Sequence, residues 1–302
     1  MIRLQNVRKK FGARVAVDNL NLHIPRGEIY GLLGHNGAGK STAIGMMLGQ
    51  VWPTDGEVMV CGHDVTRQRR RALLRVGAIF ETPAFYDFLS GRHNLEILSN
   101  YSAPTPRARI MEVIERVGLS GRENSRVKTY SHGMRTRLAL AQALLPNPEL
   151  LILDEPGDGL DPEGIHDMRQ TILRLHGEYG LTILLSSHLL AEVEQICTRI
   201  AVLRKGCKVY DGSLKESQGG TWLRLNVSDL DRAVAELRAA KLIGESREGG
   251  LIQPANGVGS DVIVRRLVEL GISVYEIARA EHTLEQFYLD LMKKEPTPPQ
   301  DS

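Results

Sequence analysis

The segment from residue 34 to residue 41 constrains the fold of this chain more than any other. It reads GHNGAGKS, a match to the pattern GxxxxGK[ST], and it lies between a short apolar segment, 28–33, and a helical pattern at 41–48. Glycines suit a loop whose backbone N–H groups turn inward around phosphate oxygens, and the start of the next helix adds its dipole. A chance glycine-rich turn is the alternative, but the flanking strand and helix favour a phosphate-binding loop.

A pair of carboxylates at 154 and 155 fits the same chemistry. Within the loop, Lys40 would supply a charge to the β- and γ-phosphates, and the Ser41 hydroxyl would be a ligand of Mg²⁺. Residues 150–155 read LLILDE, which predicts a buried strand that ends in two acidic residues. Asp154 would hold the metal ion, directly or through water, and Glu155 would polarise the attacking water. Acidic strand ends are common, so this indication depends on its combination with the loop.

Two further features admit both a bland and a functional interpretation. His188 follows a buried segment, 181–185, and either is an ordinary surface histidine or hydrogen-bonds a γ-phosphate. Ser131, in YSHGM at 130–134, suits the N-cap of a helix that begins near Arg135. Capping alone explains it. The functional interpretation is that this helix start binds a phosphate of a nucleotide held by another subunit.

Composition narrows the class of protein. The 302 residues carry 38 basic and 36 acidic side chains, a net charge of +2, which argues against nucleic acid as the main partner. The three cysteines are scattered and predict free thiols in a reducing compartment. The N-terminus lacks the apolar region of a signal peptide, and no segment approaches the roughly 20 apolar residues that span a bilayer. A membrane role would therefore be carried by another chain.

Alternating strands and helices predict an α/β domain over residues 1–212, with a helical subdomain at about 85–145. A polar linker is predicted at 213–220. Residues 221–294 predict a small accessory α+β domain whose order of elements resembles a split βαβ, ferredoxin-like unit. Residues 295–302 predict a disordered tail.

The strand patterns differ in kind. Residues 2–7 and 15–24 alternate apolar and polar side chains and predict edge-like, half-exposed strands, whereas 150–153 and 181–185 are unbroken and predict buried parallel strands. Further strands are predicted at 56–60 and 76–80, a mostly helical stretch at 85–128, and helices at 135–145 and 164–179.

These motifs, in this order, resemble the ATP-binding subunit of an ABC transporter. The order is Phe11, GHNGAGKS, the strand end at Glu81, YSHGM, LLILDE, GLD at 159–161 and His188. The resemblance covers roughly residues 1–212. YSHGM stands where the family has its LSGGQ-type signature; it keeps the serine and the central glycine, whereas His132 and Met134 depart from the commonest form. The resemblance implies a P-loop NTPase fold with a β-subdomain, a RecA-like core and a helical subdomain.

The resemblance also implies roles for single residues. Phe11 would stack on adenine, Glu155 would be the general base, His188 the switch histidine, and Asp161 part of a loop that communicates across a dimer. ATP would be bound with Mg²⁺. The phosphates would be bound by Gly34, His35, Asn36, Gly37, Ala38, Gly39, Lys40, Ser41 and Thr42, the metal by Ser41, Glu81 and Asp154, and the other subunit's ATP by Ser131, His132, Gly133 and Met134.

Glu81 and the residues after it are unusual within this pattern. Residues 76–89 read VGAIFETPAFYDFL, and most relatives have Gln where Glu81 stands. A carboxylate is a stronger ligand for a hard cation than an amide, so Glu81 predicts a more metal-dependent site. The aromatic residues Phe85, Tyr86 and Phe88 are either core or a contact for a permease. The basic run at 67–71 is either a solvated helix face or a site for anionic lipid or nucleic acid.

The resemblance implies partners as well. They are a second ATP-binding subunit, identical or similar, arranged head to tail, and a separate integral-membrane permease at the cytoplasmic face of the cell membrane. The context of Glu81 and the C-terminal extension resemble the subgroup of bacitracin-resistance and lantibiotic-immunity exporters, which implies export of a drug, antibiotic peptide or lipid-like cargo. The alternative is a soluble ABC-type ATPase acting on nucleic acid or ribosomes; a single cassette with net charge +2 disfavours it. A small-molecule kinase would give no reason for YSHGM or His188.

Overall fold

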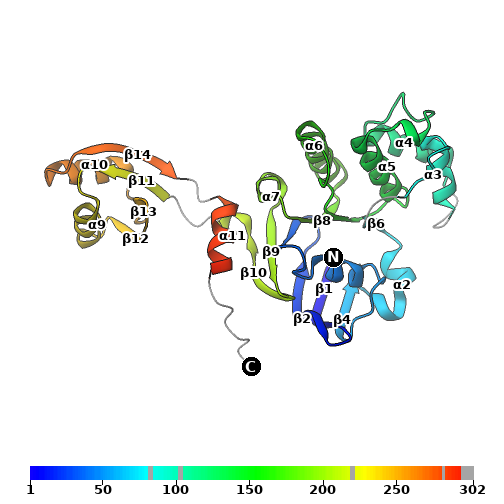
Figure 1. The fold of residues 1–302 in the computed structure, drawn as a ribbon, viewed down its shortest axis with the longest axis horizontal. Helices are drawn as coiled ribbons and strands as arrows, with labels where there is room; N and C mark the ends of the chain where they lie inside the picture. Colours follow the sequence, from blue (N-terminus) through cyan, green and yellow to red (C-terminus); the bar gives the residue numbers. More distant parts are fainter. Residues whose placement is uncertain (81–83, 101–104, 218–221, 281–282, 294–302) are drawn as a thin grey trace. The chain divides into compact units, whose positions relative to one another are not determined.

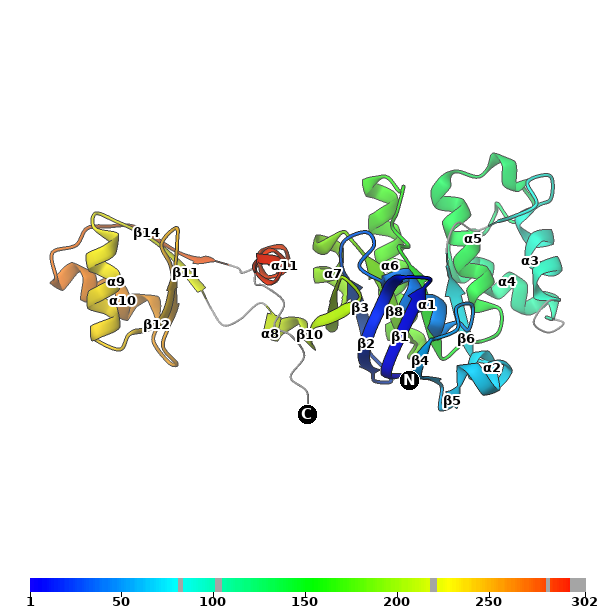
Figure 2. The same cartoon turned by 60° about the horizontal axis from the view of Figure 1, so that its bottom comes forward.

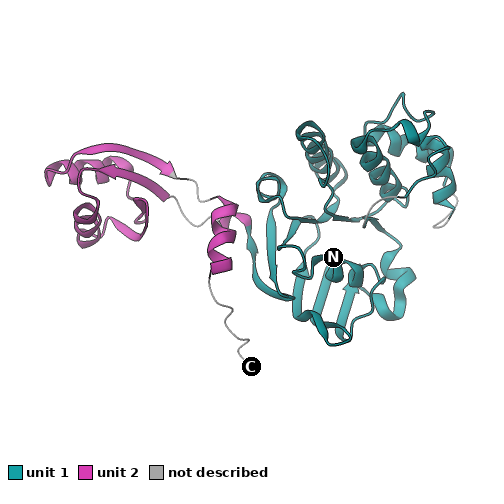
Figure 3. Ribbon diagram, in the orientation of Figure 1, with its two compact units in different colours: residues 1–213, 294–302 teal, residues 214–293 magenta. Residues whose placement is uncertain are grey.

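The computed structural model describes residues 1–80, 84–100, 105–217, 222–280 and 283–293 (Figure 1). The described chain divides into two compact units, Met1–Ser213 and Leu214–Lys293 (Figure 3). Glu81 and the predicted tail at 295–302 lie outside the described residues. None of the helices in the described ranges combines the length and apolar character that crossing a bilayer requires.

A six-stranded sheet forms the centre of the first unit. Its order is β10 (Cys207–Ser213), β9 (Arg199–Arg204), β3 (Ile29–Leu33), β8 (Thr182–Ser187), β7 (Leu150–Asp154) and β6 (Val76–Ile79). The strands from β9 to β6 are parallel, and β10 pairs antiparallel with β9. The unbroken apolar strands are covered on both faces, as parallel strands usually are. The predicted buried parallel strands at 150–153 and 181–185 are confirmed, and both extend to polar residues at their carboxyl ends.

Layers on both faces of this sheet bury its side chains. Tyr30 and Leu32 of β3 belong to one core cluster with the second sheet and α1, while α7 packs against β3 and α6 packs against α7. The helices in these layers are α1 (Lys40–Met47), α6 (Pro162–Tyr179) and α7 (Leu190–Ile196). The parallel strands thus hold their carboxyl ends, with the predicted motifs, along one edge of a rigid sheet.

The second sheet of this unit is antiparallel. Its order is β2 (Arg14–Ile24), β1 (Ile2–Phe11), β4 (Asp55–Val60) and β5 (His63–Asp64), and α2 (Val65–Leu73) follows it. The prediction that 2–7 is an edge-like strand is wrong, because β1 lies between β2 and β4. Its alternation reflects one buried face, with Ile2, Leu4 and Val7 in the core, and carries no information about position within the sheet.

A group of helices packs beside β6, as Figures 1 and 2 show. It contains α3 (Gly91–Ser99), α4 (Arg107–Arg116), the short 3₁₀ helix η1 (Val127–Thr129) and α5 (His132–Leu144). The stretch 85–128 was predicted to be mostly helical with turns, one of them at 118–121. The structure has α3 and α4 there, and the predicted turn lies within a non-helical segment over 117–126. Helix α5 begins three residues before the predicted start, since the Ser131 hydroxyl accepts a hydrogen bond from the Met134 backbone N–H.

The second unit has the order of a split βαβ sheet. Its elements are α8 (Leu214–Ser217), β11 (Trp222–Val227), α9 (Leu230–Ala239), β12 (Ile243–Arg247), β13 (Leu251–Pro254), α10 (Ser260–Glu269), β14 (Val274–Ala280) and α11 (Leu284–Lys293). The strands lie in the order β12-β13-β11-β14, all antiparallel. In the segment predicted as a linker, 213–220, Ser213 is the last residue of β10 and Leu214–Ser217 form α8, in which Leu214 is buried and which contacts α11.

Candidate active site

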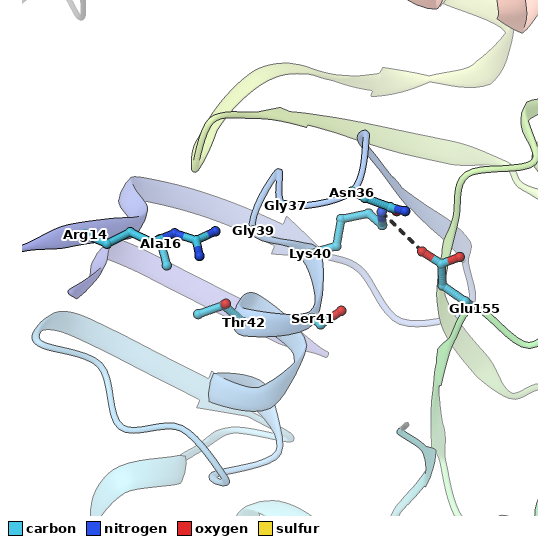
Figure 4. A pocket seen from close by; sticks show the side chains of 9 residues that line it. All are labelled: Arg14, Ala16, Asn36, Gly37, Gly39, Lys40, Ser41, Thr42 and Glu155. Carbon is cyan, nitrogen blue, oxygen red and sulfur yellow. Dashed lines mark ion pairs between the residues drawn. The ribbon is translucent and has the colours of Figure 1, made fainter. Parts of the chain in front are cut away.

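A pocket of about 290 Å³ lies where β3 passes into α1 (Figure 4). Its lining is made of Arg14, Ala16, Asn36, Gly37, Gly39, Lys40, Ser41, Thr42 and Glu155. Gly39 shows why the loop needs glycine: its φ is +106°, and an added Cβ would lie 2.7 Å from the Ala16 carbonyl oxygen. The backbone of the loop can therefore turn toward the pocket only without a side chain at this position.

Lys40 joins the loop to the predicted general base. Its side chain is only 5% exposed, and its ammonium donates a hydrogen bond to the Gly34 carbonyl oxygen at 2.8 Å. The same nitrogen lies 3.2 Å from the Glu155 Oε1 (Figure 4). A buried ammonium needs such partners, since an unpaired buried charge is costly. The structure thus brings together the two motifs that the sequence predicted to act on one phosphate group.

The backbone of Glu155 is turned out of the strand. Its φ is +49°, in the left-handed region, which is uncommon for a residue with a side chain. This backbone conformation costs of order 1 kcal/mol or more. Its backbone N–H is bound by the Ser186 carbonyl oxygen at 3.2 Å and by the Ser186 hydroxyl at 3.0 Å. These bonds offset the strain, and the turn directs the carboxylate into the pocket.

Ser186 was not among the predicted site residues. It is buried at the carboxyl end of β8, and its hydroxyl donates to the Asp154 Oδ1 while it accepts from the backbone of Glu155. One side chain therefore fixes both carboxylate residues. Two consecutive serines at the end of an otherwise apolar strand, directly before His188, are the signal in the sequence that could have identified it.

His188 contacts Glu155, the predicted general base, from the other side. Its Nδ1 hydrogen-bonds the Glu155 Oε2, so each oxygen of that carboxylate has its own partner: Lys40 on one and His188 on the other. His188 does not line the pocket. Within the described residues, Lys40, Glu155 and His188 form one connected polar chain across the carboxyl ends of β3, β7 and β8.

Phe11 lies at the end of β1 rather than in the pocket wall. Its side chain is 51% exposed, and the Lys9 ammonium lies 4.8 Å from the ring centre. In the β1–β2 pairing its partner is Arg14, which does line the pocket. An exposed ring beside the pocket-lining strand is compatible with base stacking, and that role stays a prediction.

The signature residues lie away from the pocket. Ser131, His132, Gly133 and Met134 form the start of α5, and none of them lines it. Asp161 caps α6, where its Oδ1 accepts from the Gly164 N–H at 2.8 Å. The chain therefore has one phosphate loop with its carboxylates and, on a separate element, a second helix start whose residues do not line that pocket.

The donor set at this site suits Mg²⁺. The Ser41 hydroxyl and the Asp154 carboxylate are hard oxygen ligands at the ends of the elements that border the pocket. Mg²⁺ is usually held by one or two such protein ligands, with water and substrate phosphates completing its octahedron. The two described side chains fit that pattern, and Glu81 would be a third by the sequence prediction.

Comparison with known proteins identifies the family. The sequence model described as "ABC transporter" matches residues 17–158. The bacitracin transport ATP-binding protein BcrA of Bacillus licheniformis is 37% identical over 299 residues, covering 97% of this chain and 97% of BcrA. This chain belongs to the ABC transporter ATP-binding proteins. As an ABC ATPase it binds and hydrolyses ATP, and the family assignment extends through the second unit because BcrA is matched over nearly its whole length.

Two further similarities bear on function and fold. The daunorubicin resistance ATP-binding protein DrrA3 of Streptomyces coeruleorubidus is 35% identical over 301 residues, covering 96% of this chain and 95% of DrrA3. The ATP-binding cassette MJ0796, solved as a dimer in a post-hydrolysis state with ADP and Pi, matches with a TM-score of 0.64 at 26% identity, covering 71% of this chain and 99% of that cassette. The predicted P-loop NTPase fold of the ABC type is thereby confirmed.

Proposed function

We propose that this chain is the ATP-hydrolysing subunit of an exporter and that it energises a separately encoded membrane permease from the cytoplasmic face. The observation that carries the proposal is the arrangement of Lys40, Glu155 and His188 at the mouth of the phosphate loop. The export direction is supported by the relatives named for bacitracin transport and daunorubicin resistance. One of these relatives is named for bacitracin transport and the other for daunorubicin resistance, so the class of cargo that we propose is a drug or an antibiotic peptide.

The mechanism uses the partners that each group has in the structure. Lys40 moves from Glu155 to the β- and γ-phosphates, which releases the carboxylate to act as general base toward water. His188 keeps its Nδ1 on the other carboxylate oxygen and presents its Nε2 to the γ-phosphate. Ser41 and Asp154, with Glu81, would hold Mg²⁺, which when bound would supply positive charge to the phosphate oxygens.

A second copy of this chain, or a similar one, completes the site. The start of α5 is capped by Ser131 and directs the positive end of a helix dipole outward, which suits a phosphate. Because this helix start does not border the chain's own pocket, we propose that it meets the ATP bound by the other subunit, head to tail. The dimeric structure of the similar cassette MJ0796 supports this arrangement.

The aromatic segment before α3 is the surface that we propose contacts the permease. Tyr86 and Phe88 are 42% and 69% exposed, and their rings lie edge to face with centres 6.0 Å apart. Exposed apolar clusters of this kind mark partner sites more often than isolated exposed residues do. Asp87, between them, forms a 2.8 Å ion pair with Arg135 of α5, so this segment is tied to the helix that carries the signature.

The decisive experiment is reconstitution. The chain is expressed with the proposed permease, which is to be sought among multi-span proteins encoded beside it. The complex is placed in vesicles, and cargo movement and ATP hydrolysis are measured together. We expect both activities in the complex and neither in Glu155→Gln, and we expect a cross-linker at Tyr86 to capture the permease. ATP hydrolysis that needs no membrane partner, with the chain sedimenting on ribosomes, would instead support the soluble alternative.

A further inference from the structure

The side chain of His132 connects the start of α5 to the loop that follows Glu155. Its Nε2 lies 3.1 Å from the backbone carbonyl oxygen of Asp158, 26 positions further along the chain. A carbonyl oxygen can only accept a hydrogen bond, so the Nε2 carries the proton and donates it. In the LSGGQ-type signature that YSHGM resembles, this position is glycine, which has no side chain that could make this bond.

Gly159 shows how closely the imidazole and the loop approach each other. Its φ is +70°, and an added Cβ would lie 3.2 Å from the His132 Nε2. A side chain at 159 would therefore meet both backbone strain and the ring. The glycine leaves the space that His132 occupies, so the hydrogen bond and the glycine belong to one arrangement.

The loop from 155 to 161 is short and fixed at both ends. Glu155 is held at one end by Lys40 and His188, and Asp161 caps α6 at the other. Inside the loop, the Asp158 N–H donates to the Glu155 carbonyl oxygen at 3.0 Å. The Asp158 peptide is thus bonded on one side to the general base and on the other side to His132.

We propose that His132 is a positioning residue that couples the two ATP sites of the dimer. This inference rests on the proposed head-to-tail dimer, in which Ser131 meets the partner's ATP while Glu155 acts on the chain's own ATP. A shift of the α5 start when the partner's site fills is passed through His132 to Asp158 and on to Glu155. Binding at one site therefore changes the geometry of the general base at the other, a coupling between distinct sites.

The test is the ATP concentration dependence of hydrolysis by the full-length protein in its membrane complex. We expect a Hill coefficient above 1 for the wild type, with about 2 as the limit for two sites, and a value near 1 for His132→Ala. His132→Gln is the matched rescue variant, because its amide nitrogen can donate where the Nε2 did, and it should restore the coefficient. His63→Ala, which removes a histidine from the remote strand β5, should leave the coefficient unchanged.

The possible outcomes distinguish a failure of this inference from a failure of the proposed function on which it rests. A merely structural role for His132 would lower the amount of active enzyme, and hence kcat, and leave the Hill coefficient as in the wild type; that result would overturn the inference. Loss of cooperativity in His132→Ala and His132→Gln alike would show that the hydrogen bond is not the basis of the cooperativity. A Hill coefficient of 1 in the wild type would show that the two ATP sites are not coupled, and this result would also overturn the inference. A wild-type complex without ATP hydrolysis would contradict the proposed function itself.

Discussion

The Lys40 ammonium and the Glu155 carboxylate are ion-paired at 3.2 Å, across the mouth of the pocket. The cation that should bind phosphate and the base that should act on water are therefore each other's partners. Both groups must exchange this contact for the substrate before hydrolysis can proceed. Substitution of Lys40 should therefore weaken nucleotide binding, whereas substitution of Glu155 should leave binding intact and prevent hydrolysis.

Removal of the cation should weaken binding. We expect Lys40→Ala to bind a non-hydrolysable ATP analogue about ten- to a hundredfold more weakly, the range for losing a hydrogen bond to a charged group. Titration calorimetry measures this directly. Lys128 is exposed in the 3₁₀ helix and does not line the pocket, so Lys128→Ala is the control and should bind as the wild type does. Unchanged affinity in Lys40→Ala would contradict the assigned phosphate contact.

Removal of the base should spare binding. We expect Glu155→Gln to keep ATP affinity, to lower turnover by about a hundred- to ten-thousandfold, the contribution typical of general base catalysis, and to accumulate an ATP-bound dimer on gel filtration. The exposed strand residue Glu57 supplies the control, since Glu57→Gln changes the same functional group outside the site. Wild-type turnover in Glu155→Gln would contradict the role of this carboxylate as the general base.

The serine behind the two carboxylates should act through the metal. Ser186→Ala removes the donor to Asp154 and the acceptor for the Glu155 N–H. Hydrogen bonds that orient a metal ligand are commonly worth about ten- to a hundredfold in metal affinity, so the Mg²⁺ concentration for half-maximal hydrolysis should rise by that order. Its neighbour Ser187 bonds only the Leu189 N–H among the contacts described, so Ser187→Ala should leave the Mg²⁺ dependence as it is.

A half-buried acid beside the loop predicts a pH effect on stability. Burial raises the pKa of Glu192 above its ordinary value, and the nearby Arg169 and His188 lower it by less. The folded chain thus holds the Glu192 proton more tightly than the unfolded chain does. The contribution of this proton to the free energy of unfolding is fully present below the unfolded pKa, about 4.3. It is lost as the pH rises from there through the folded pKa. Glu192→Gln should therefore flatten this part of the melting temperature profile and melt higher at neutral pH, whereas the exposed Glu178→Gln should not.

Glu81 predicts a further dependence on the metal. If its carboxylate is a ligand, Glu81→Gln should shift the Mg²⁺ titration of ATP hydrolysis and weaken selection against metal-free nucleotide, because the charge that repels the γ-phosphate is gone. The measurement is hydrolysis at fixed ATP over a range of free Mg²⁺. An unchanged Mg²⁺ titration would show that the Glu81 carboxylate and a glutamine amide at this position are equivalent for metal dependence.

The parts of the site that could be predicted from the sequence are those where one short segment carries both the chemistry and its context. GHNGAGKS and LLILDE each contain the strand end and the reactive side chain, and the structure brings Lys40 and Glu155 into contact. Ser186 and Arg14 lie outside those two motifs. The role of Ser186 depends on the pairing of β8 with β7, which are distant in the sequence, and Arg14 is placed at the pocket by β2, which lies beside the phosphate loop. The alternation in residues 2–7 likewise identified a buried face and could not reveal which strands lie on either side of β1.

The position of β8 between β3 and β7 has a consequence for how related sequences are interpreted. Neighbouring strands are about 4.8 Å apart, so two such steps place the phosphate loop and Asp154 about 10 Å from one another at the sheet edge. A one-residue deletion in β8 would turn Ser186 to the opposite face and shift His188, while both well-known motifs stayed intact. A homologue with perfect loop and acid motifs and a shortened β8 should therefore bind ATP and fail to cleave it, an inactive paralogue that motif searches would count as an enzyme.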